Sequence, residues 1–213
     1  MSVLDEILEI YEKIKPQIEK RLQEFKELYK NGSDERIFAE MAFCLLTPQS
    51  KAKVCWAAIE RLMENGLLYT GSPSEILPHL KGVRFSDRKA EYIVRAREMF
   101  YDGRWHLKSF IDSFDDVFRL REWLVQNVKG YGYKEASHFL RNIGKGENLA
   151  ILDRHILKNL ALLGVIPEVP KSLSRSRYLY IEDEMRKFSE KIGIPMDHLD
   201  LLLWYKEAGE VFK

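Results

Sequence analysis

The sequence holds little of what most metal, cofactor or membrane proteins need. Only two cysteines, Cys44 and Cys55, occur in 213 residues, which is too few for a four-cysteine zinc or iron–sulfur site. The five histidines form no H-E-x-x-H motif and no other paired ligand spacing. No apolar run reaches the roughly 18 residues that a membrane span requires. We therefore expect no metal, no cofactor and no membrane partner.

Glycine and proline are also scarce, with 12 and 7 residues, which excludes collagen-like and linker-rich chains. Apolar residues make up 46% and charged residues 31%, a balance typical of a soluble globular protein. The chain begins with acidic residues, Asp5 and Glu6, where a secretory signal carries basic ones. The sequence thus predicts a cytoplasmic protein with one large domain or two lobes.

An excess of either charge is missing too, since 34 basic side chains balance 33 acidic ones. Residues 81–145 nevertheless hold 14 basic and 9 acidic side chains. This asymmetry permits contact with a polyanion, although mixtures of Lys and Glu are usual on solvated helix faces. Charge alone is therefore only weak evidence for a nucleic-acid partner.

What the sequence does contain is helical periodicity. Apolar residues recur at three- and four-residue steps, which predicts helices and leaves no sustained strand alternation. The segment Ser72-Pro73-Ser74-Glu75 has the pattern of a capping box. The other predicted helices cover 3–29, 34–46, 51–65, 86–101, 107–111, 114–128, 134–143, 153–164, 174–192 and 196–208. The predicted fold class is all-α.

Two glycines one residue apart, Gly130 and Gly132, separate two of these helices. Their conformational freedom allows consecutive N–H groups to point outward at a helix N-terminus, and such a nest binds phosphate without reading base sequence. The alternative is an ordinary tight turn, because G-x-G alone is a weak motif.

Two ionisable residues follow this hairpin. Lys134 lies in the first turn of the next helix, where the helix dipole disfavours a cation. Such a site lowers the pKa of a lysine and can make it a nucleophile, although most lysines are plain surface residues. Asp153 precedes another apolar-periodic segment and is expected to cap that helix. If its second oxygen faces a cleft, it can also stabilise a developing positive charge.

Together these segments resemble the helix–hairpin–helix DNA glycosylase superfamily, and more closely its archaeal-type 8-oxoguanine DNA glycosylase/AP lyases. The matching segments are 134–142, 153–156, 200–207, 44–47 and 89–93. The cysteine cluster of the endonuclease-III-like branch is missing, which argues against that branch. The resemblance implies two helical lobes, residues 33–143 and residues 1–32 plus 144–213, with a cleft for DNA and the extruded base between them.

The resemblance also implies individual roles. Lys134 matches the Schiff-base lysine, and Asp153 matches the aspartate near the scissile sugar. The residues implied in base recognition are Trp204, Lys213, Phe85 and His138. Those implied in DNA contact are Gly130, Gly132, Gln49 and Arg84. The resemblance implies that Trp204 stacks on the extruded base, that Lys213 contributes its terminal carboxylate, and that Gln49 fills the gap that the base leaves.

The implied function is excision of 8-oxoguanine from duplex DNA, with strand cleavage at abasic sites, by a monomer in the prokaryotic cytoplasm near the nucleoid. Two alternatives stay open. One is a non-catalytic helix–hairpin–helix DNA-binding module, and the other is a glycosylase of the same fold that removes oxidised pyrimidines.

Overall fold

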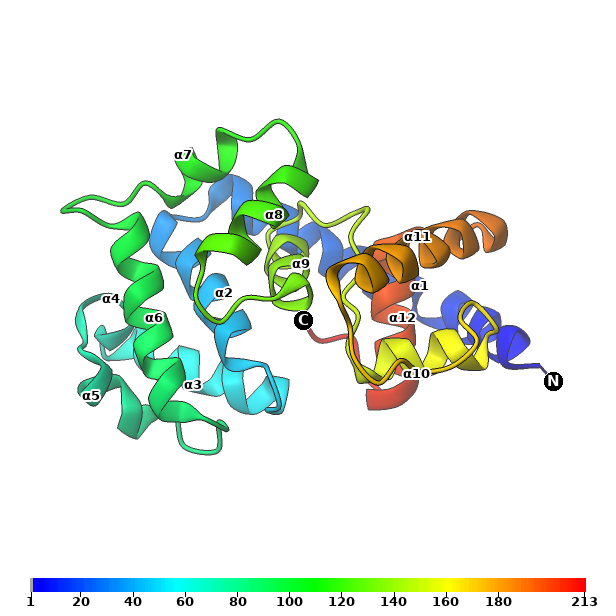
Figure 1. The fold of residues 1–213 in the computed structure, drawn as a ribbon, viewed down its shortest axis with the longest axis horizontal. Coiled ribbons are helices and arrows are strands. Elements are labelled where there is room, and N and C mark those ends of the chain that lie inside the picture. Colours follow the sequence, from blue (N-terminus) through cyan, green and yellow to red (C-terminus); the bar gives the residue numbers. More distant parts are fainter. Residues whose placement is uncertain (1) are drawn as a thin grey trace. The chain divides into compact units, whose positions relative to one another are not determined.

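The structure, a computed structural model, describes residues 2–213 and is built almost entirely from helices (Figure 1). Within this range there is no strand, only an isolated bridge between Tyr101 and Trp105. The predicted all-α class is confirmed. The helices are α1 Val3–Asn31, α2 Asp34–Leu46, α3 Ala52–Glu64, α4 Leu67–Thr70, α5 Pro73–Ile76, the 3-10 helix η1 Leu77–His79, α6 Ser86–Phe100, α7 Leu107–Asp112, α8 Val117–Asn127, α9 Tyr133–Asn142, α10 Arg154–Leu162, α11 Arg175–Ile192 and α12 Met196–Ala208.

The chain folds into two compact units. The first comprises Met1–Lys26 and Leu140–Lys213, and the second comprises Glu27–Phe139. Both limits fall inside helices, in α1 and α9, whereas the lobes predicted from the sequence end in the loops that follow these helices. No helix in residues 2–213 is long and apolar enough to cross a membrane.

The second unit is organised around α2. Ser33 caps this helix by accepting a hydrogen bond from the backbone N–H of Arg36, and every residue of 37–46 is buried. Because residues 37–46 are apolar apart from Glu40, this part of α2 must be covered on all sides. It packs against α3, α6 and α7, which surround it in Figure 1. Its C-terminus therefore ends inside the unit, next to the start of α6.

One predicted boundary in this unit is wrong. The helix expected over 114–128 begins only at Val117, because the Asp116 carboxylate accepts a hydrogen bond from the backbone N–H of Phe118 at 2.8 Å and acts as the N-cap. The capping box predicted at Ser72 and Glu75 is present, with both reciprocal hydrogen bonds.

The first unit is held together by α12, which packs against α10 and α11. Its Leu199 and Leu201–Leu203 are buried, as is Asp200. The Asp200 carboxylate lies 2.7 Å from the Arg141 guanidinium, and both side chains are almost completely inaccessible. Burial raises the pKa of Asp200 to about 7, and the positive charge of Arg141 opposes that rise.

We expect Arg141→Met to destabilise the protein by about 3–5 kcal/mol, because it leaves a buried carboxylate unpaired. Without Arg141 the pKa of Asp200 rises further in the folded state. The folded protein then holds a proton that the unfolded chain releases, so stability falls as pH rises through the folded-state pKa. Urea unfolding at pH 5 and pH 8 should show the larger loss at pH 8. A loss under about 1 kcal/mol at both pH values contradicts the prediction.

Candidate active site

The hairpin between α8 and α9 is anchored to α2. Tyr131, at its centre, is buried and donates a hydrogen bond to the backbone carbonyl of Met41 at 2.8 Å. Gly130 has φ +97°, and a Cβ atom at this position would lie 2.6 Å from Cδ2 of Tyr92. Gly130 is thus required both for its backbone conformation and for a close approach. Gly132 does not have a positive φ, so of the two glycines only Gly130 adopts the backbone conformation that favours glycine.

Gly132 instead serves as the residue before α9. Its backbone N–H donates to Glu135 Oε2 at 2.9 Å, which satisfies one of the orphan donors of the helix N-terminus. The other oxygen of the same carboxylate lies 3.1 Å from Lys134 Nζ, and the Lys134 side chain is 23% exposed. Glu135 therefore connects the hairpin to Lys134 and orients the amine of a side chain that is still partly exposed.

Asp153 caps α10, as predicted, because its Oδ1 accepts from the backbone N–H of Ile156 at 2.8 Å. Its second oxygen is also occupied. Oδ2 accepts a hydrogen bond from Nε1 of Trp204 at 2.7 Å. Two donors on two different helices therefore fix the carboxylate, and Trp204 has an orienting contact that the sequence did not indicate.

Trp204 is held in turn by contacts between α12 and α10. Its ring meets the His155 ring edge-on, with centroids 5.1 Å apart. One turn later, Glu207 accepts hydrogen bonds from Lys158 at 3.0 Å and Asn159 at 2.9 Å. These hydrogen bonds hold the pKa of Glu207 below its usual value, the one from Asn159 most strongly. The contacts between α10 and α12 thus hold the Asp153 carboxylate and the Trp204 indole in fixed positions relative to each other.

Gln49 and Phe85 share an unusual backbone. They have φ of 54° and 56°, and within residues 2–213 they are the only non-glycine residues with positive φ. Gln49 follows Pro48 in a turn closed by the hydrogen bond from Ser50 N to Thr47 O, a position that normally takes Gly or Asn. Phe85 precedes α6 and is 49% exposed. Such conformations cost of order 1–3 kcal/mol each and persist only where the surroundings impose them.

Three predicted residues lie as follows. Arg84 is exposed, with its guanidinium 5.5 Å from the centroid of the Phe85 ring. Lys213 is half-buried and follows Gly209, which ends α12. His138 is buried within α9, where its ring lies 5.5 Å from that of Phe43. In this structure His138 belongs to the packing of the second unit, because its ring faces the interior.

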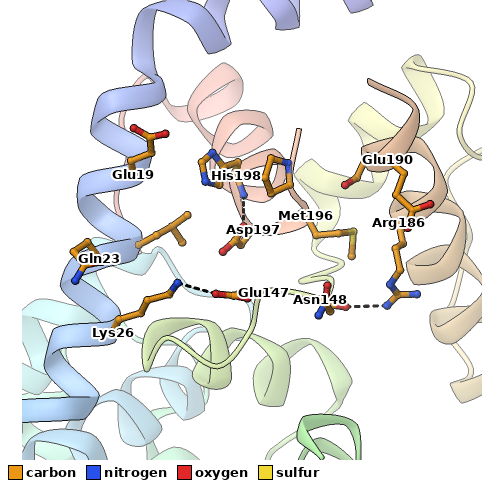
Figure 2. Close-up of a pocket in the computed structure, with 13 residues that line it drawn as sticks. Glu19, Gln23, Lys26, Glu147, Asn148, Arg186, Glu190, Met196, Asp197 and His198 are labelled. Atoms are coloured by element: carbon orange, nitrogen blue, oxygen red, sulfur yellow. Dashed lines mark hydrogen bonds and ion pairs between the residues drawn. The ribbon is translucent and has the colours of Figure 1, made fainter. Parts of the chain in front are cut away.

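A cavity of about 540 Å³ opens in the first unit, lined by parts of α1, α11, α12 and the loop before Ala150 (Figure 2). Lys26 and Glu147 form an ion pair of 2.7 Å at its wall. Burial raises the pKa of Asp197 and lowers that of His198, whose Nδ1 lies 3.0 Å from the Tyr11 hydroxyl. None of the residues predicted from the sequence lines this cavity, so it is separate from the candidate active site.

Residues 2–213 contain no group of three or more His, Cys, Asp or Glu side chains that could hold a metal. Both cysteines are buried, and burial raises the pKa of Cys55 to about 11, which disfavours the nucleophilic thiolate form. Lys134 and Asp153 are the two ionisable residues for which the sequence predicts a chemical role, and each is held by the contacts described above.

We expect Gly130→Val to weaken binding to damaged and undamaged duplex DNA about equally, by about 10-fold, which corresponds to loss of one phosphate hydrogen bond. The cause is twofold, because a β-branched residue resists positive φ and its Cβ meets the Tyr92 ring. Gly66→Val is the matched control, since Gly66 also has positive φ but has open space around its Cβ position. Equilibrium binding at two salt concentrations tests this. A loss confined to one sequence context contradicts a phosphate-binding role.

Known proteins match this chain over most of its length. The protein family described as 8-oxoguanine DNA glycosylase matches residues 18–194. An 8-oxoguanine DNA glycosylase/AP lyase from Fusobacterium nucleatum is 50% identical, covering 98% of this chain and 97% of its own. The enzyme of that name from Methanocaldococcus jannaschii is 44% identical over 94% of this chain and 93% of its own.

A solved structure adds the fold. The M. jannaschii 8-oxoguanine glycosylase/lyase, in complex with a 15-mer DNA containing 8-oxoguanine, superimposes with a TM-score of 0.90. It is 40% identical in sequence, and the match covers all of both chains. The similarity extends over both compact units, including the hairpin and the segments that carry Lys134 and Asp153. The chain belongs to the 8-oxoguanine DNA glycosylase family.

Proposed function

We propose that this chain excises 8-oxoguanine from duplex DNA in base-excision repair and then cleaves the strand at the abasic site. The observation that carries the proposal is the partly exposed Lys134 side chain, whose amine is held by Glu135 at the start of α9, directly after the hairpin. A hairpin that binds phosphate brings such an amine to the DNA backbone, beside the deoxyribose. We further propose that the protein acts as a monomer in the cytoplasm.

The target nucleotide must first leave the helical stack, because its sugar and base are otherwise inaccessible. Extrusion costs a few kcal/mol. Contacts from the hairpin to phosphate offset part of this cost, and the side chains of Gln49, Arg84 and Phe85 are proposed to occupy the vacated space and contact the orphaned base. All three are exposed, as such a role requires.

In its neutral form the Lys134 amine then bonds to the sugar C1′ as the bond from C1′ to the base breaks. The departing base keeps the bonding electrons and takes up a proton. Positive charge grows on the sugar during this step, and the Asp153 carboxylate stabilises it. Trp204 and the N-cap hydrogen bond hold that carboxylate still, so little reorganisation is needed.

Strand cleavage follows from the same adduct. Opening of the sugar ring and loss of a proton from nitrogen give an imine between Lys134 and C1′. The imine acidifies the C2′ proton, and removal of that proton expels the 3′ phosphate by β-elimination. Lys134 therefore serves both reactions, whereas base recognition is needed only for the first.

Discrimination rests on one proton. 8-Oxoguanine carries hydrogen on N7, whereas guanine carries a lone pair there. An acceptor facing N7 gains a hydrogen bond with the damaged base and repels the normal one, a difference of roughly 1–3 kcal/mol. We propose the carboxylate of Lys213 for this acceptor and the ring of Trp204 for stacking.

The proposed function is tested by comparing duplexes that carry 8-oxoguanine, an oxidised pyrimidine or an abasic site. We expect cleavage of the first and third. Preferential cleavage of the oxidised pyrimidine supports a glycosylase of different specificity. Binding without cleavage of any duplex supports a non-catalytic binding module.

Extending the chain past Lys213 with a short tag should lower 8-oxoguanine excision by about 10-fold or more, because the tag removes the acceptor for N7–H. Cleavage of an abasic site, which has no base to recognise, should change far less. A matched tag at the N-terminus is the control. Equal excision by tagged and untagged protein contradicts a recognition role for the Lys213 carboxylate.

A further inference from the structure

The turns that carry Gln49 and Phe85 are joined by a shared set of hydrogen bonds. The Ser50 hydroxyl, next to Gln49, accepts from the backbone N–H of Arg84 at 2.9 Å. Arg84 is the neighbour of Phe85, so this single bond fixes the two turns to each other. Both exposed side chains thus project from one connected piece of backbone.

Lys89 completes this connection from the inside. It lies in the second turn of α6 and is 4% exposed, an unusual position for a lysine. Its Nζ donates to Pro48 O at 2.6 Å, to Leu46 O at 2.8 Å and to Ser50 Oγ at 3.3 Å. All three donors of the ammonium group are therefore directed at the segment that carries Gln49.

The acceptors explain why a lysine suits this position. Leu46 is the last residue of α2, where backbone carbonyls have no helical partner and the helix dipole favours a cation. Burial lowers the pKa of Lys89 to about 8, and the nearby Lys134 adds to this effect. The three atoms that face its Nζ are all oxygen acceptors, so the ammonium form of Lys89 can donate to each of them.

We propose that Lys89 is a positioning residue that, with Ser50, fastens the Gln49 and Phe85 turns into one rigid wedge for insertion into DNA. This inference rests on the proposed function, which places both side chains in the space left by the extruded base. A wedge that is already ordered loses little conformational freedom on insertion. Without the hydrogen bonds of Lys89 and Ser50, Gln49 and Phe85 can leave their strained backbone conformations. Each insertion into DNA must then order the two turns again.

This role makes a selective prediction. The wedge matters only when a stacked and paired nucleotide has to be displaced. Lys89→Met, which keeps most of the unbranched side chain but removes its donors, should slow excision from a fully paired 8-oxoguanine duplex by at least about 10-fold, within the range caused by small misplacements. Excision from an unpaired bulge, and cleavage at an abasic site, should fall less than about 3-fold.

Two further variants make the test decisive. Lys81→Met removes the same charge from an exposed residue of the loop before α6 and should behave like the parent. Ser50→Ala removes the acceptor for Arg84 and one acceptor for Lys89, so it should show the same preference for the bulged substrate. If Lys89→Met fails to fold, as judged by circular dichroism, the Ser50→Ala result decides.

The measurement is single-turnover excision on paired and bulged duplexes. Cleavage of an abasic duplex is the control that shows whether the catalytic chemistry is intact. A larger loss on the paired duplex than on the other two supports the wedge. Equal losses on all three substrates, or no loss on the paired duplex, overturn it. Failure of the parent protein to excise 8-oxoguanine overturns the proposed function itself, and the inference with it.

Discussion

Replacing Lys134 with Gln should slow both 8-oxoguanine release and abasic-site cleavage by at least about 10³-fold, while the fold remains intact. The side chain lies in the first turn of α9, is 23% exposed, and forms an ion pair with Glu135. Glutamine keeps an unbranched polar side chain, one atom shorter than lysine, but has no nucleophilic amine. Single-turnover rates on both substrates, with circular dichroism as the check on folding, make the comparison.

Lys129→Gln is the matched control. Lys129 is exposed on the same hairpin and carries the same charge, so the variant reports the loss of one basic group from the DNA-binding surface. We expect Lys129→Gln to weaken binding slightly and to leave the rate of bound enzyme near that of the parent. If Lys129→Gln were inactive and Lys134→Gln active, the nucleophile would be Lys129.

Replacing Asp153 with Asn should lower the rate of base excision by about 10²–10³-fold, because it removes the charge that we propose stabilises the sugar. Asn caps helices about as well as Asp, so the hydrogen bond from Ile156 N can persist. The amide nitrogen of Asn then faces the Trp204 N–H, which is donor against donor. A modest loss of stability, about 0.5–1.5 kcal/mol, should accompany the loss of activity.

Trp204→Phe separates the two roles of the indole. Phenylalanine keeps a ring that can stack on a base but removes the donor to Asp153. If Trp204 orients Asp153, this variant should also slow abasic-site cleavage, where there is no base to stack on.

For the Asp153→Asn variant, near-parental activity would contradict a catalytic role and leave Asp153 as a helix cap alone.

Local signals in the sequence predicted most of the helices and the cap at Asp153. Periodicity reports burial of one helix face, and capping residues act within four residues of their own position, so both can be read without tertiary structure. The helix expected from 114 shows the limit of this reading. The Asp116 carboxylate accepts a hydrogen bond from the backbone N–H of Phe118 and so sets the helix start, which the apolar spacing alone does not reveal.

The sequence alone also could not predict the contacts that define the site, because they depend on tertiary structure. Trp204 and Asp153 are 51 residues apart, and no local pattern joins them. Lys89 would be assigned to the surface by its residue type, because burial of a lysine depends on acceptors supplied by α2 and the turn after it. The positive φ of Gln49 and Phe85 was equally hidden, since the sequence places neither Gly nor Asn there.

The most direct test of the central claim is to identify the atom that attacks the sugar. The parent protein is incubated with a duplex containing 8-oxoguanine in the presence of borohydride, which reduces the imine to a stable amine. The trapped complex is then digested, and the modified peptide is sequenced by mass spectrometry. We predict one adduct, on Lys134 within the Tyr133–Asn142 helix. An adduct on any other residue, or base release with no adduct at all, would contradict the account.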